Sequence, residues 1–288
     1  MFSNAYKIAS GFTFPVITSK RFFDGAVESS LASFILLNDQ GWLLTAAHVV
    51  EPLNVIVQHK KEIDEYNMKI ESIQKNTQWN VKQKRQKIGN LPKNNKWITN
   101  ISHWWGADGI KISSFSVFPA ADFAVGKIEN YKAKPMQVYP KFRPTSDDLI
   151  GSSLCKLGFP FYNIKTTWDP SLNRFSIPPK TFPIPRFPID GIGTRFSLLE
   201  LPNKYMVKFI ETSSPGLRGQ SGGPIFDKNG CVCAVQIRTH HYPLGFNPEI
   251  ELNGKKVMEV QYLNVGVGIT SDTILPFLEK QNILVEII

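Results

Sequence analysis

Cysteine is scarce in this sequence, with only Cys155, Cys231 and Cys233 among 288 residues. Cys231 and Cys233 stand two residues apart in an apolar run. On a strand they would point to the same face about 7 Å apart, which is too far for an easy disulfide. No His or Cys pair stands at the spacing of a zinc site. We therefore expect buried free thiols, no metal, and a reducing compartment, which makes a cytoplasmic location the prediction.

Long apolar runs are missing as well. The longest, residues 31–37 and 42–50, fall well short of the roughly 20 residues that a membrane-spanning helix needs. The first seven residues show no basic head followed by an apolar run, so no secretory signal is visible. The sequence therefore predicts no membrane segment and no export.

The composition that remains is that of a globular chain rich in short strands. Twenty glycines and twenty prolines interrupt helices often and follow no collagen-like period. Apolar segments separated by turn residues recur along most of the chain, which is typical of a sandwich or a barrel. The clearest hairpins lie at residues 33–46, 225–237 and 249–262, and the last has Asn253-Gly254 at its turn. An all-β fold is the prediction.

Three segments depart from this strand pattern. Residues 60–88 contain no glycine and no proline, and their apolar residues recur at helical spacing, which predicts one long amphipathic helix. Residues 160–188 hold seven of the twenty prolines, so we expect an extended surface loop there. Residues 271–281 have the pattern of a short C-terminal helix.

A proline-containing interval at residues 132–148 is the best candidate boundary between two halves. The sequence thus predicts an N-terminal domain, residues 1–140, that includes the helical insertion. A C-terminal domain, residues 141–288, would include the proline-rich loop and the last helix.

Ser221 stands among residues that have almost no side chain, in the sequence Gly-Gln-Ser-Gly-Gly-Pro at 219–224. Such a loop allows backbone N–H groups to converge beside the hydroxyl, as an oxyanion hole requires. A hydroxyl is a poor nucleophile at neutral pH, so a histidine must accept its proton and a carboxylate must orient the imidazole.

The same six residues match G-x-S-x-G, the nucleophile elbow of α/β-hydrolases. That elbow runs straight into a helix, whereas Gly222, Gly223 and Pro224 begin a helix poorly and a hairpin turn follows at once. The elbow also requires the acid and the histidine to follow the serine, where only Asp227 and His240 or His241 lie close by. This interpretation is excluded.

The opposite order provides both partners. His48 ends an apolar strand, Asp122 begins another, and Ser221 follows, which is the His, Asp, Ser order of chymotrypsin. Asp108 is the alternative acid, but Gly106 and Gly109 beside it indicate a turn, so Asp122 is favoured. The remaining histidines, including His59 and His103, are expected at the surface or in loops.

Three motifs in this order resemble the catalytic motifs of the trypsin/chymotrypsin-like serine proteases. They are Thr-Ala-Ala-His at 45–48, Asp-Phe-Ala-Val at 122–125 and the loop at 219–224. The short turns and the lack of paired cysteines resemble the bacterial members, including the heat-shock protease group. The resemblance implies a chymotrypsin-like fold of two antiparallel six-stranded β-barrels with the cleft between them.

The resemblance also assigns roles to further residues. It implies that the N–H groups of Gly219 and Ser221 form the oxyanion hole, and that Pro215, Gln236 and Arg238 contribute to substrate binding. Pro215 stands where trypsin has its acidic pocket base, so a preference for Lys or Arg is not supported. Gln220 replaces the aspartate that pairs with a new N-terminus in digestive relatives, which argues against a zymogen switch of that kind.

The sequence therefore predicts a serine endopeptidase that needs no cofactor and acts on protein or peptide substrates. Restraint of a cytoplasmic protease would need narrow specificity or a regulatory partner on the helical insertion, as in a stress, defence or cell-death protease. The alternative is a binding module that uses this basic insertion. Residues 55–96 carry ten Lys or Arg against four Asp or Glu, a large part of the net charge of +9. Because no base-reading module accompanies them, nucleic acid is not the favoured partner.

Overall fold

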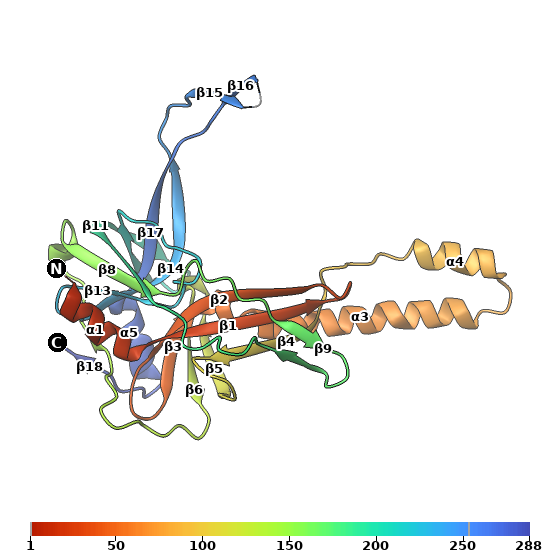
Figure 1. Ribbon diagram of the computed structural model, residues 1–288, viewed down its shortest axis with the longest axis horizontal. Coiled ribbons are helices and arrows are strands. Elements are labelled where there is room, and N and C mark those ends of the chain that lie inside the picture. Colours follow the sequence, from red (N-terminus) through yellow and green to blue (C-terminus); the bar gives the residue numbers. More distant parts are fainter. Residues whose placement is uncertain (1, 253) are drawn as a thin grey trace.

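The fold is mostly β, as predicted, with two sheets at its centre and two projections (Figure 1). The computed structural model describes residues 2–252 and 254–288, so Asn253 of the predicted turn lies outside the described residues. One projection is a helical arm between the third and fourth strands, and the other is a hairpin near the C-terminus. None of the described helices is both long and apolar enough to cross a membrane.

The first sheet has six strands in the order β4-β1-β2-β3-β6-β5. Its strands are β1 (Thr13–Phe22), β2 (Val27–Leu36), β3 (Trp42–Ala46), β4 (Ile98–Trp105), β5 (Ile112–Phe118) and β6 (Phe123–Ile128). The predicted hairpin at residues 33–46 is confirmed, because β2 pairs with β3 through Ile35 opposite Leu44.

The prediction of a closed first barrel is wrong for the described residues, because the outer strands β4 and β5 do not pair with each other. Gly106 and Gly109, both with positive φ, turn the chain between these strands, and the register of β5 shifts after Ile112. The rings of Trp105 and Phe115 pack 5.5 Å apart instead. Side-chain packing therefore joins the two edges where backbone bonds are missing.

The second sheet closes into a ring of six strands. The strands are β8 (Ser153–Gly158), β11 (Phe187–Glu200), β12 (Met206–Thr212), β17 (Tyr262–Thr270), β14 (Val232–Pro243) and β13 (Pro224–Phe226). An additional β13–β14 pairing closes the ring, and the short strands β7 (Lys141–Phe142) and β18 (Glu286–Ile287) extend the sheet beyond β14. The predicted six-stranded second barrel and the hairpin at residues 225–237 agree with this arrangement.

Smaller elements flank the sheets. They are α1 (Ser3–Phe12), α2 (Ala47–Val50), α5 (Ser271–Lys280), the 3₁₀ turns η1 (Pro119–Ala121) and η2 (Asp147–Leu149), and the paired strands β9 (Thr167–Asp169) with β10 (Arg174–Ser176) and β15 (Glu249–Leu252) with β16 (Lys255–Met258). The C-terminal helix is confirmed. Helix α1 was not predicted, yet its Ala5, Ala9 and Phe12 are buried in the main core.

The helical insertion consists of two helices, α3 (Pro52–Lys75) and α4 (Val81–Gly89), so the prediction of one helix over 60–88 is wrong. The first helix begins earlier because Pro52 occupies its first turn, where a missing N–H costs nothing. The second begins at Asn80, whose side chain forms a capping box with Gln83 and so favours a new helix start there. Together they form the projecting arm of Figure 1.

Only the base of the arm is tied to the first sheet. Trp97 Nε1 donates to Glu62, and the backbone N–H of Ile98 donates to Nδ1 of His59 at 2.8 Å. The rings of Tyr66 and Trp97 pack 5.6 Å apart. Among the described residues of the distal half, including α4, Ile73 alone has a buried side chain.

The proline-rich segment 160–188 is more than the extended surface loop that we predicted. It contains the β9–β10 hairpin, and Ile164, Phe175 and Ile184 form a second hydrophobic cluster with Ile17 and Trp104 of the first sheet. Apolar residues between the prolines explain the difference, because burying them holds the segment on the sheet. The three cysteines are free and buried.

Candidate active site

His48 and Asp122 are brought together by the pairing of β3 with β6. Ala46 lies opposite Phe123 in that register, so the residues just beyond these strand ends are neighbours. The backbone N–H of Ala47 donates to the carbonyl of Asp122 at 3.0 Å. The Asp122 backbone has φ of 52°, a left-handed conformation that turns its carboxylate back toward His48.

The Asp122 carboxylate holds His48 at two points. It accepts the backbone N–H of His48 at 3.0 Å, and its two oxygens lie 3.1 and 2.9 Å from Nδ1 of the ring. A proton on Nδ1 satisfies this contact and leaves Nε2 as an acceptor. Asp108, the alternative acid, caps the N–H of Gly109 and forms no bond with His48 among the described residues.

Ser221 lies on the loop between β12 and β13, and the first sheet holds this loop in place. The N–H of Ser33 on β2 donates to the carbonyl of Ser221 at 2.8 Å, and Ser33 Oγ donates to the carbonyl of Gly219 at 2.7 Å. Thr45, three residues before His48, donates in turn to the carbonyl of Ser33 at 2.8 Å. Strand β3, which ends two residues before His48, is thus connected to the serine loop through two successive hydrogen bonds.

His48, Gly219 and Ser221 line one cavity of about 610 Å³. Among the described residues, no hydrogen bond joins His48 to Ser221, and the N–H groups of Gly219 and Ser221 have no protein acceptor. Two unpaired backbone donors beside a serine hydroxyl can bind a developing oxyanion. The geometry therefore places His48, Ser221 and the two backbone donors at a single opening, while Asp122 contacts His48 without lining this cavity.

Gln220 holds the turn between these two donors. Its side chain is fully buried, and its Oε1 accepts the N–H of Leu217 at 2.9 Å, while its own N–H donates to the Leu217 carbonyl at 2.9 Å. The carbonyl of Gly219 also accepts the N–H of Phe159 at 3.0 Å. Neutral hydrogen bonds therefore fix this loop at the position where digestive relatives use an ion pair.

The residues predicted to bind substrate lie outside this cavity. Gln236 is buried, and its Nε2 donates to the carbonyls of Arg238 at 2.6 Å and Val267 at 3.2 Å. The exposed Arg238 guanidinium lies 5.1 Å from the centre of the Phe209 ring. The carbonyl of Pro215 accepts a hydrogen bond from a buried lysine. Any substrate role for these three residues concerns a different part of the cleft.

That buried lysine, Lys156 on β8, was not predicted. Its side chain is 1% exposed, and Nζ donates to the carbonyls of Ser214 at 2.5 Å and Pro215 at 2.8 Å and contacts Thr212 Oγ1 at 3.0 Å. Burial lowers the pKa of Lys156 from 10.5 to about 7. Lys156 thus anchors the start of the loop that carries Ser221, and its neighbouring sequence does not predict this role.

The depressed pKa of Lys156 predicts that stability rises with pH above neutrality. The unfolded lysine keeps its proton up to about pH 10.5, whereas the folded one releases it near pH 7. The unfolded state then binds more protons, so the free energy of unfolding should increase by up to about 1.4 kcal/mol per pH unit. Urea unfolding between pH 7 and 8 should show this increase, because thiols of the unfolded chain, with an ordinary pKa of about 8.5, are still mostly protonated there. Lys156→Met should lack it, and equal slopes in both proteins would contradict the assignment.

His103 was predicted at the surface, but it is only partly exposed and lies next to Val49, the residue that follows His48. Its Nε2 lies 3.2 Å from the carbonyl of Val49, the residue after His48, and its ring stacks on Trp105 at 5.7 Å. Burial lowers the pKa of His103 to about 4, so the ring is neutral at pH 7 and Nε2–H donates to Val49. His103 thereby supports the short helix α2 that carries His48.

Gly222 occupies a position that admits no side chain. Its φ is +83°, and a Cβ atom there would lie 2.2 Å from the carbonyl oxygen of Ser33 and 2.5 Å from Thr45 Oγ1. We expect Gly222→Ala to lower the free energy of unfolding by roughly 2–4 kcal/mol, because strain and a backbone clash combine. Gly109→Ala is the matched control, with φ of +79° and open space around the Cβ, and should cost about 1 kcal/mol. Equal losses in urea unfolding would contradict this explanation.

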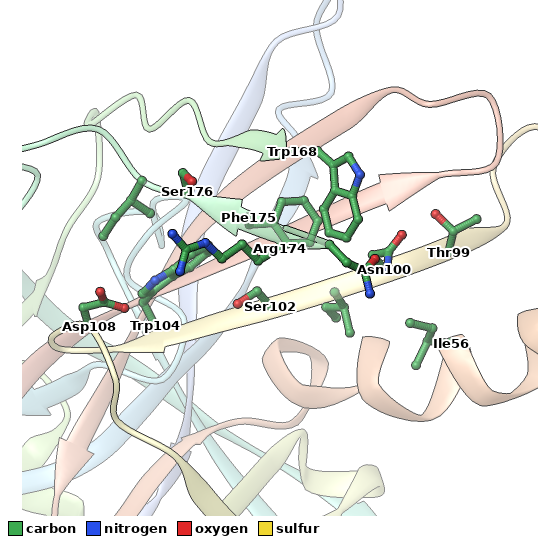
Figure 2. Close-up of a pocket in the computed structure, with 13 residues that line it drawn as sticks. Ile56, Thr99, Asn100, Ser102, Trp104, Asp108, Trp168, Arg174, Phe175 and Ser176 are labelled. Carbon is green, nitrogen blue, oxygen red and sulfur yellow. The ribbon is translucent and has the colours of Figure 1, made fainter. Parts of the chain in front are cut away.

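A second large cavity, of about 640 Å³, lies beneath the β9–β10 hairpin (Figure 2). Asn100 and Ser102 of β4 face Arg174 and Trp168 of the hairpin across it. Asp108 lies at one end, and none of His48, Asp122 and Ser221 lines this cavity. This cavity is therefore separate from the candidate active site. Because Asp108 lines it, the position of Asp108 is a second argument against assigning this residue as the acid.

Among known proteins, the family pattern described as a trypsin-like peptidase domain matches residues 32–235, well over half of the chain. The HtrA-type protease AlgW with tripeptide is similar at 16% identity and TM-score 0.49, and the match covers 98% of this chain and 64% of AlgW. The active form of the Rv3671c protease from M. tuberculosis is similar at 12% identity and TM-score 0.49, and the match covers 96% of this chain and 83% of the Rv3671c chain. The chain thus spans less than two thirds of AlgW, and the curated proteins contain no match.

Proposed function

Because the chain belongs to the trypsin-like peptidase family, we propose that it is a serine endopeptidase acting through an acyl-enzyme on Ser221. The observation that carries this proposal is the pair of contacts, 2.9 and 3.1 Å, between Asp122 and Nδ1 of His48 beside the cavity that Ser221 lines. Such an arrangement provides a base, its orienting carboxylate and a nucleophile. The substrates are protein or peptide chains, and every group that the reaction needs is supplied by the protein.

In this mechanism, Ser221 Oγ forms a bond to the scissile carbonyl carbon while its proton passes to Nε2 of His48. The carbonyl oxygen becomes negative and accepts hydrogen bonds from the N–H groups of Gly219 and Ser221. The C–N bond then breaks, and the leaving amine takes the proton from His48. Water repeats the sequence on the ester, which releases the acid and returns the proton to Ser221.

Proteolysis of an unfolded protein tests this proposal. Wild-type protein should digest denatured casein at neutral pH, and His48→Ala should remove the activity while the fold is retained. His103→Ala is not a suitable control, because it supports the same helix. His59→Ala is a suitable control, because His59 contacts the base of the arm and does not contact Asp122. Digestion at equal rates by wild type and His48→Ala would contradict the proposal.

The position of the arm supports control of this activity by a protein partner. Helix α3 begins at Pro52, four residues after His48, and Glu51, Asn54 and Gln58 line a cavity of about 490 Å³ together with His48 and Asp122. A partner that binds the arm could therefore change access to the catalytic pair. A cytoplasmic protease of the stress, defence or cell-death type would use such control.

Shortening the arm tests this regulatory role. Residues 70–90 can be replaced by a short Gly/Ser linker, which keeps Glu62 and Tyr66 and their contacts with Trp97. The shortened protein should cleave small peptides like wild type but lose its dependence on a binding partner or change its cleavage of folded proteins. An unchanged cleavage profile on both substrate classes would exclude the role.

A further inference from the structure

The cavity beside Ser221 carries positive charge and no negative charge. Apart from His48, Lys20 and Arg218 are its only charged lining residues within the described part of the chain, and no described aspartate or glutamate lines it. The remaining lining includes Leu31, Phe159 and other apolar or hydroxyl side chains. A substrate segment that fills this cavity therefore meets cations on an otherwise neutral surface.

Neither cation is neutralised by the protein. The salt bridges among the described residues include neither Lys20 nor Arg218. Glu28, which lies opposite Lys20 in the β1–β2 register, has its carboxylate 3.2 Å from Lys96 instead. Arg218 is exposed, and Lys20 is partly exposed. Both side chains are thus available to an acidic group of a ligand.

The two cations lie at different distances from the nucleophile. Arg218 directly precedes Gly219, so it stands next to the predicted oxyanion hole. Ser33 of β2 bonds to the carbonyl of Ser221, while Lys20 lies opposite Glu28, five residues farther along β2. At about 3.3 Å per residue, Lys20 is roughly 16 Å along the strand from Ser221.

We propose that this cavity selects acidic substrate segments, with Arg218 binding a carboxylate next to the scissile bond and Lys20 binding one four or five residues away. The inference rests on the proposed endopeptidase function and names its substrate class. An extended peptide advances by nearly the same distance per residue as β2, so the two positions follow from the spacing of the cations.

The side of the scissile bond also follows from the arrangement. By the resemblance, the strand with Gln236 and Arg238 pairs with substrate, and neither residue lines this cavity. We assign that strand to the substrate residues before the scissile bond. The cavity between β1, β2 and residues 159–163 therefore binds the substrate residues that follow the scissile bond. Acidic residues are therefore expected at the first or second position after the cleaved bond, and again at the fourth or fifth.

Cleavage of a proteome-derived peptide library tests the proposal. For wild type, Asp and Glu should be enriched at least about threefold at both positions, as expected for partly exposed charge pairs. The enrichment should fall when NaCl is raised from 50 to 500 mM, because salt screens exposed charges. Neutral or basic preference at these positions would overturn the proposal.

Two substitutions separate the contributions. Arg218→Gln should remove the enrichment next to the scissile bond and keep the distant one, and Lys20→Gln should do the reverse. Lys111→Gln is the matched control, because it removes an exposed lysine just before β5 that does not line the cavity, and it should leave both preferences intact. Unchanged preferences in both Arg218→Gln and Lys20→Gln would also overturn the proposal.

The same library distinguishes this proposal from the function on which it rests. If wild type cleaves the peptides and Ser221→Ala does not, the endopeptidase function stands. The enrichment of Asp and Glu at the expected positions then tests the proposed specificity by itself. If wild type cleaves nothing, while circular dichroism shows a folded protein, the proposed function fails and the specificity with it.

Discussion

Ser221→Ala is expected to lower kcat/KM for peptide cleavage by about 10⁶-fold, because the nucleophile is lost and the remaining groups cannot replace it. The residual rate should reflect substrate binding and the oxyanion donors alone. The fold should be preserved, since the contacts of this residue with the first sheet go through its backbone carbonyl, which an alanine retains.

Initial rates on a quenched fluorescent peptide measure this effect. Ser114→Ala is a suitable control, because Ser114 is exposed on the first sheet and its substitution removes the same atom far from the catalytic pair. The control should retain wild-type activity. Retention of more than about a hundredth of the activity by Ser221→Ala, in protein with an unchanged unfolding midpoint, would exclude Ser221 as the nucleophile.

Asp122→Asn is expected to lower kcat by about 10⁴-fold with little effect on folding. An asparagine oxygen can still accept the backbone N–H of His48, so the local structure should persist. The amide can present its NH₂ to Nδ1, which favours the tautomer with the proton on Nε2. That nitrogen then cannot accept the proton of Ser221.

The chain offers a matched control for this substitution. Asp108→Asn makes the same chemical change in the acid that the sequence left as the alternative, and it should leave kcat unchanged. Steady-state rates for the two variants therefore identify the acid directly. A large loss in Asp108→Asn with a small one in Asp122→Asn would reverse the assignment.

The sequence predicted the strands well where local patterns decide the structure. Alternating apolar residues and a turn at residues 38–41 were sufficient for the β2–β3 hairpin. The division of the helical insertion depended on the capping box at Asn80, which competes with an otherwise continuous helical pattern. The opening between β4 and β5 depends on packing between strand edges, which no local pattern contains.

The candidate site shows the same division. His48, Asp122 and Ser221 stand in short motifs, so their proximity could be predicted from the order of the motifs. Lys156 and His103 stand in ordinary strand sequence, and their roles arise from partners 54 to 59 residues away along the chain. Sequence spacing alone cannot reveal such partners, because the sheet register brings them together.

In the proposed mechanism, Ser221 is a nucleophile activated by His48. A fluorophosphonate probe tests it most directly, because the probe phosphonylates only a serine whose proton is removed by a positioned base. Wild type should be labelled, with the added mass mapped by peptide mass spectrometry to Ser221, and Ser221→Ala and His48→Ala should remain unlabelled. Labelling of Ser221→Ala equal to that of wild type, or attachment to another residue, would exclude Ser221 as the activated nucleophile.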